Sequence, residues 1–207
     1  MNLNHKILTL NMVRHGRTEG NIQKLMSGHT DHQLVQEGID ELLEMKEQMT
    51  YPAFDRLYSS DLSRAYRTAE ILFEQEVKVE NRRYGLREIY FGDIENLHFE
   101  GKLQNFYKDF FGDSPKLINA ENGPMFQNRV MDELQVIAQE MVHENLDSAM
   151  IVAHAGTIRM THYTFLEIEQ KNYRDLEIDN GTGFSFKVAY DVKNRQFQLL
   201  DYAPIDI

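Results

Sequence analysis

The stretch ILTLNMVRHG, residues 7–16, joins an apolar segment to an abrupt polar turn. Its first seven residues are apolar or β-branched with few exceptions, which predicts a β-strand that ends at Arg14-His15-Gly16. The same succession returns late in the chain, where AMIVA at residues 149–153 is followed by HAGT at residues 154–157. A continuous apolar run of that length is typical of a strand covered on both faces. Two predicted strands therefore each end next to a histidine.

The segments between and around these two strands alternate between strand and helix patterns. Apolar residues recur at helical spacing over residues 37–49, and residues 55–60 predict a second short strand. Ser60 or Asp61 is placed to cap a helix that follows it. Further helices are predicted from Phe126 to Met141 and from the second histidine motif to Leu166, and alternating residues 184–190 and 197–202 predict a β-hairpin at a sheet edge. We expect an α/β fold, a three-layer α/β/α sandwich around a mostly parallel mixed sheet.

The domain organisation follows from the length of 207 residues and from one irregular segment. A composition of 42% hydrophobic and 27% charged residues is that of one compact domain, here residues 1–207. The apolar residues of the segment 93–124 follow neither the helical nor the strand period, which predicts a small cap insertion over the active site. Its aromatic residues, Phe106 to Phe111, are more typical of a packing face than of a substrate platform. They also offer a surface on which a homodimer could form.

Composition excludes several classes of function. The chain has 22 Lys and Arg against 33 Asp and Glu, a formal charge of −11, which argues against nucleic acid as a partner. No apolar run approaches the roughly 20 residues that span a bilayer, so we expect no membrane segment. The absence of cysteine excludes disulfides, thiolate zinc sites and thiol nucleophiles, and we expect a cytoplasmic protein.

Four candidate site residues lie just after predicted strands, where α/β sheets bind their ligands. They are Arg14, His15, Arg64 and His154. Two guanidiniums and two imidazoles at one place in an acidic protein indicate an anion site, and phosphate suits the forked arginine side chain.

The motifs around these residues resemble those of the histidine phosphatase, or phosphoglycerate mutase-like, superfamily. They occur in the family's order and span most of the chain: RHGRTEGN at 14–21, SSDLSRAYRTA at 59–69, LREIYFG at 86–92 and VAHAGTIR at 152–159. One such triplet is modest evidence, but four motifs at strand ends and helix starts make coincidence a poor explanation.

The resemblance implies a role for each residue. His15 would be the nucleophile that carries the phosphoryl group, while Arg14, Arg64 and protonated His154 would bind the nonbridging oxygens. Glu88 would donate a proton to the leaving group, although a structural or solvated carboxylate is the alternative. Asn21 and Ala155 complete the expected phosphate contacts, with a turn residue as the alternative for Asn21. The resemblance implies no metal and no cofactor.

The expected function is that of a metal-independent phosphomonoesterase, which acts through a phosphohistidine on a small phosphorylated metabolite. Mutases of this superfamily tend to carry a longer segment between the acid and the second histidine than Glu88 to His154, which favours the phosphatase. A 2,3-bisphosphoglycerate-dependent phosphoglycerate mutase is one alternative. The other is a non-catalytic phosphate-binding regulator, suggested by GDIEN at residues 92–96, which lacks an aromatic residue and a second glycine often found there.

Overall fold

The computed structural model describes residues 5–100, 106–107, 109–112 and 119–205. Its strands are β1 (His5–Arg14), β2 (Arg56–Ser60), β3 (Arg82–Arg83), β4 (Ser148–Ala153), β5 (Gly183–Asp191) and β6 (Gln196–Ile205). Its α-helices are α1 (Glu19–Ile22), α2 (Gln36–Gln48), α3 (Ser63–Phe73), α5 (Gly123–His143) and α6 (Ala155–Phe165). Short 3-10 turns are η1 (Val79–Asn81), η2 (Tyr84–Leu86), η3 (Gly92–Ile94) and η4 (Gln170–Asn172). Among the described residues, no helix is both long enough and apolar enough to cross a membrane.

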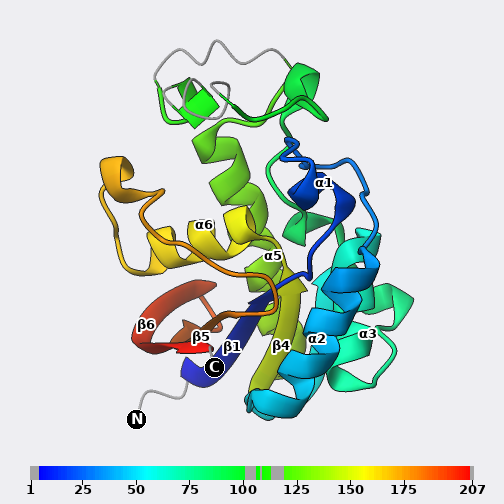
Figure 1. The fold of residues 1–207 in the computed structure, drawn as a ribbon. Helices are drawn as coiled ribbons and strands as arrows, with labels where there is room; N and C mark the ends of the chain where they lie inside the picture. The colour runs from blue at the N-terminus through cyan, green and yellow to red at the C-terminus, as the bar shows by residue number, and fades with distance from the viewer. Residues whose placement is uncertain (1–4, 101–105, 108, 113–118, 206–207) are drawn as a thin grey trace.

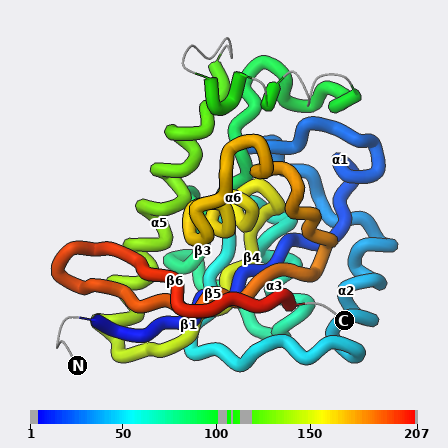
Figure 2. The backbone as a smooth tube through the Cα atoms, turned by 90° about the vertical axis from the view of Figure 1, so that its left-hand side faces the viewer, coloured from blue at the N-terminus to red at the C-terminus, as the bar shows by residue number. Residues whose placement is uncertain are grey.

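The strands form one six-stranded mixed sheet in the order β3-β2-β4-β1-β5-β6. The first four are mutually parallel, β5 is antiparallel to β1, and β6 pairs with β5 at the sheet edge as predicted (Figure 2). In the register of β1 with β4, Arg14 lies opposite Ala153. Since parallel strands share a carboxyl edge, the two histidines that follow these residues are brought together.

Helices cover both faces of the sheet, which confirms the three-layer α/β/α architecture (Figure 1). Leu8, Leu10 and Met12 of β1 project into a core shared with α5 and α6. Val13 points the opposite way, into a second core formed with α2 and α3. This alternation follows from the two-residue period of a strand, and it explains why the central strands are apolar on both sides.

The predicted cap of α3 is wrong. The N-cap position is Leu62, and neither Ser60 nor Asp61 caps the helix with its side chain. Instead Asp31 Oδ1 accepts hydrogen bonds from the Ser63 backbone N–H at 2.9 Å and from Ser63 Oγ at 2.8 Å. The free N–H at the helix start is satisfied by a loop more than 30 residues away, a contact that local sequence does not encode.

The aromatic residues of the segment 93–124 form a packing face, as expected. Phe106 and Phe110 are buried, with ring centroids 5.3 Å apart, and they contact Phe91, Phe126 and Tyr173. The described parts of this segment lie at the end of the molecule where the parallel strands terminate (Figure 1). Residues 101–105, 108 and 113–118 of the predicted insertion lie outside the described residues.

Candidate active site

The turn after β1 is held by hydrogen bonds from three other parts of the chain. The His15 backbone N–H donates to Ala153 O at 3.0 Å, and the Gly16 N–H donates to Thr68 Oγ1 at 2.8 Å. Asn180 Nδ2 donates to His15 O at 2.7 Å. The position of His15 is therefore fixed by β4, α3 and the segment before β5, and motif reasoning assigned no role to Thr68 or Asn180.

The imidazole rings of His15 and His154 make an edge-to-face contact: their centroids are 5.1 Å apart, and the angle between the ring planes is 62°. His15 Nδ1 lies 2.7 Å from Gly16 O, and a carbonyl oxygen can only accept. Nδ1 therefore carries the proton, which leaves the lone pair of the neutral ring on Nε2. The local backbone thus selects the tautomer that presents Nε2 as a nucleophile.

Both guanidiniums are held by backbone carbonyls. Arg64 Nη1 donates to Thr30 O at 2.7 Å, and Nη2 donates to Gly28 O at 2.7 Å and to Ser27 O at 3.2 Å. Arg14 Nη1 donates to Ile178 O at 2.6 Å. These bonds fix the orientation of each side chain without using all of its donors.

Burial determines the charge of the site. It lowers the pKa of both His15 and His154 well below the ordinary value of 6.5, and the nearby Arg64 guanidinium lowers both further. His154 is therefore neutral in the protein without a bound anion, and its protonation when a phosphate is bound stays a prediction. Burial also lowers the pKa of Arg14, and it lowers that of Arg64 to about 10. The two arginines remain cations, so the site is positive while both imidazoles are neutral.

Four buried nitrogen atoms around His15 have no hydrogen-bond partner among the described residues: Arg14 Nε, Arg64 Nε, and both ring nitrogens of His154. A buried donor without an acceptor is costly and requires an explanation. A tetrahedral oxyanion would supply acceptors to the guanidiniums at once. Within the described parts of the chain, no three His, Asp or Glu side chains are grouped so that they could hold a metal ion.

Glu88, in the segment after η2, places its side chain against the first turn of α6. Its Oε2 accepts from the Gly156 backbone N–H at 2.9 Å, and its Oε1 accepts from the Ile89 N–H at 2.9 Å. A Cβ atom at Gly156 would lie 1.8 Å from Glu88 Oε1. The carboxylate thus occupies the space that a side chain at position 156 would fill, two residues after His154.

The remaining predicted contacts are Asn21 and Ala155. Asn21 forms a capping box with Thr18, in which Asn21 Oδ1 accepts from the Thr18 N–H at 3.1 Å. This is the turn role that was the alternative reading, and the phosphate contact of Asn21 stays a prediction. Ala155 is the first residue of α6, where backbone N–H groups have no acceptor within the helix and favour an anion.

Arg129 of α5 braces the segment that carries Glu88, and motif reasoning missed it. Its guanidinium forms a bidentate pair with Glu121 at 2.6 and 2.7 Å. The other donors bind Gly85 O, Arg87 O and Glu88 O, each at 2.9 Å. All five N–H donors of the guanidinium are used, so Arg129 positions the backbone of the acid-bearing segment.

Comparison with known proteins agrees with this geometry. The model of the Histidine phosphatase superfamily (branch 1) matches residues 10–200. The Adenosylcobalamin/alpha-ribazole phosphatase of Salmonella typhimurium is 26% identical over 172 residues, which cover 82% of this chain and 85% of that protein. Phosphoglycerate mutase 1 of Saccharomyces cerevisiae is 28% identical over an alignment of 219 positions, which covers 88% of this chain and 87% of that protein.

A solved structure shows the shared fold. The phosphoglycerate mutase from Bacillus anthracis matches with a TM-score of 0.74 at 21% sequence identity, covering 96% of this chain and 93% of that one. The family match begins within β1 and ends within β6, so it includes both buried histidines and most of the sheet. This chain therefore belongs to branch 1 of the histidine phosphatase superfamily.

Proposed function

We propose that this protein is a metal-independent phosphomonoesterase that hydrolyses a small phosphorylated metabolite through a phosphohistidine at His15. The observation that carries the proposal is the group of four buried, unpartnered nitrogen atoms of Arg14, Arg64 and His154 around His15. Because a guanidinium N–H can only donate, an oxyanion would supply the acceptors that Arg14 Nε and Arg64 Nε lack among the described residues, with His15 Nε2 as the nucleophile.

In the first step, a phosphate monoester binds with its nonbridging oxygens accepting from Arg14 and Arg64 and from the Ala155 N–H at the start of α6. The negative charge raises the pKa of His154, so that it can donate as well. His15 Nε2 attacks phosphorus in line, and the P–O bond to the leaving group breaks. Glu88 gives a proton to the departing alkoxide.

In the second step, a water molecule takes the place of the released alcohol. Glu88 accepts a proton from this water as its oxygen bonds to phosphorus, and the P–N bond to His15 breaks. Inorganic phosphate leaves and the neutral imidazole is restored. Because both steps pass through Glu88, the carboxylate must stay beside Gly156, where two backbone N–H groups hold it.

A mutase would use the same residues with a second hydroxyl group as the acceptor. The short segment between Glu88 and His154 supports the phosphatase. Relatives of both kinds are found at similar identity, among them the alpha-ribazole phosphatase and the yeast mutase. A mutase would transfer phosphate instead of releasing it, and 2,3-bisphosphoglycerate would stimulate it.

The test is phosphate release from a panel of aryl and metabolite phosphates in EDTA, with native protein and His15→Ala. We expect the native protein to release phosphate and His15→Ala to lose more than about 10³-fold of the rate. Isotopically labelled substrate should leave label on the native protein alone. His143→Ala, an exposed histidine near the end of α5, is the control and should keep full activity. Release that persists in His15→Ala would refute the proposal.

A further inference from the structure

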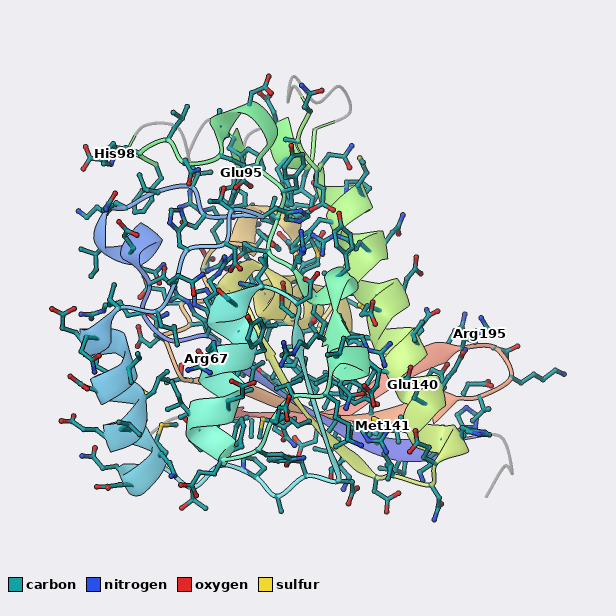
Figure 3. The ribbon with its side chains drawn as sticks, turned by 90° about the vertical axis from the view of Figure 1, so that its right-hand side faces the viewer. Arg67, Glu95, His98, Glu140, Met141 and Arg195 are labelled. Atoms are coloured by element: carbon teal, nitrogen blue, oxygen red, sulfur yellow. The ribbon has the colours of Figure 1, made fainter. Side chains whose placement is uncertain are left out.

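Glu95, just after η3, is a half-buried carboxylate that motif reasoning left without a role. Its Oε1 accepts from the His29 N–H at 2.9 Å and from the Phe91 N–H at 3.0 Å. Its Oε2 accepts from the Thr30 N–H at 3.0 Å and from Thr30 Oγ1 at 2.7 Å. Figure 3 shows Glu95 at the end of the molecule opposite Glu140. One carboxylate therefore joins the loop of residues 27–30 to the segment that follows Glu88.

The same loop is bound from its other side by Arg64. Arg64 donates to Gly28 O, while Glu95 accepts from His29 N–H. These two atoms belong to one peptide group, which is planar and rigid. The Gly28–His29 peptide thus lies between a guanidinium and a carboxylate, each bonded to one of its polar ends. If the Glu95 carboxylate moves, the planar Gly28–His29 peptide moves with it and displaces the carbonyl oxygen that Arg64 binds.

The packing at Gly28 shows how tightly this arrangement is built. A Cβ atom there would lie 2.2 Å from Glu95 Oε1 and 2.1 Å from Ile89 O. Any side chain would separate the loop from Glu95 and from the acid-bearing segment. The absence of a side chain at position 28 therefore allows the carboxylate to reach the loop backbone.

We propose that Glu95 is a positioning residue that fixes the orientation of the Arg64 guanidinium through the Gly28–His29 peptide. Arg64 is fully buried, its charge acts on both His15 and His154, and its Nε has no hydrogen-bond partner among the described residues. If the loop moves, the guanidinium is no longer held in place beside the two histidines. The inference rests on the proposed function for its effect on turnover, but its effect on anion binding does not.

The test variant is Glu95→Gln, because the amide nitrogen of Gln cannot accept a hydrogen bond. In one orientation it would face two N–H donors, His29 and Phe91, and in the other it would face the Thr30 N–H, beside a Thr30 hydroxyl group that can also accept. The matched control is Asp55→Asn. Asp55 accepts three hydrogen bonds, all at Oδ2, where Glu95 accepts four: its donors are Asp147 N–H, Ser148 N–H and Ser148 Oγ, at the amino end of β4.

Two readouts separate positioning from a purely structural role: tungstate affinity by calorimetry, and kcat and KM for an aryl phosphate. For Glu95→Gln we expect tungstate affinity and kcat each to fall about 10- to 100-fold, since a shift near 1 Å has an effect of that size. Asp55→Asn, which keeps all three hydrogen bonds when its amide oxygen takes the Oδ2 position, should leave both readouts unchanged.

A double-mutant cycle with Arg64→Ala tests the route of the effect. If Glu95 acts through Arg64, adding Glu95→Gln to the Arg64→Ala protein should reduce its tungstate affinity by less than about twofold. Losses that multiply, or a folded Glu95→Gln protein with native affinity and kcat, would overturn the inference. If the native protein binds tungstate and releases no phosphate from any substrate, the proposed function fails while the tungstate cycle still decides the role of Glu95.

Discussion

Gly156→Ala tests whether the position of the Glu88 carboxylate controls turnover. The added Cβ would lie 1.8 Å from Glu88 Oε1, and Cβ contacts in proteins essentially never fall below 3.0 Å. Oε1 must therefore retreat by at least about 1.2 Å. The group that gives way is the end of a flexible side chain, so the fold should be preserved. Alanine also favours a helix over glycine by about 1 kcal/mol.

A displacement of that size is expected to reduce kcat/KM about 10²-fold for alkyl phosphates, or about 2.7 kcal/mol of transition-state stabilisation. Aryl phosphates should lose much less, because their leaving groups depart without a proton from Glu88. The assay compares both substrates for native protein, Gly156→Ala, Glu88→Gln and the double variant. Thermal unfolding of each confirms that the proteins are folded.

The double variant should be little worse than Glu88→Gln alone, since the alanine acts by moving a group that is already disabled. Two results would refute the reasoning. One is native turnover of alkyl phosphates by Gly156→Ala. The other is an equal loss for aryl and alkyl substrates, which would show that the added methyl group disturbs phosphate binding and not proton transfer.

Two further predictions concern stability. The pKa of His154 is lowered in the folded state, so below pH 6.5 the unfolded chain binds a proton that the folded chain does not, and the free energy of unfolding should decrease as the pH falls. Urea unfolding between about pH 7.5 and about pH 5.5 should give a shallower dependence for His154→Gln, and an equal slope would contradict this. Arg129→Met should lower the free energy of unfolding by about 3 to 5 kcal/mol, because it leaves the partly buried Glu121 carboxylate without its partner and three backbone carbonyls without their donor. The control is Arg67→Met, which removes an exposed guanidinium of α3 (Figure 3) from Glu70, a carboxylate that Arg82 also binds; it should change the free energy of unfolding by about 0.5 kcal/mol or less, as measured by urea unfolding.

Much of the fold follows from local pattern in the sequence. Residues 149–153 are apolar throughout because both faces of β4 are buried, and the helical spacing of α2 and α5 reflects one buried face each. The candidate site follows as well, since the carboxyl ends of parallel strands meet at one edge and bring His15 and His154 together. Side-chain periodicity and the order of strands and helices can be read from the local sequence. A single sequence was therefore enough to predict the fold and the place of the candidate site.

Other features arise only when distant segments meet. Asp31 caps α3 from another loop, Arg129 binds the backbone around Glu88, and Glu95 grips a peptide that Arg64 holds from the opposite side. No motif marks these side chains in the sequence, because most of the groups that they bind are backbone N–H and C=O groups, which nearly every residue has.

The charge state of His154 depends on tertiary structure in the same way. Its neutral form results from burial and from the approach of Arg64, which is 90 residues away along the chain. By itself, the sequence determined which candidate site residues gather at the carboxyl edge of the sheet and on which elements they lie. Only the tertiary structure decided how these residues are held and protonated, because desolvation and hydrogen bonding to the backbone depend on where the folded chain places its segments.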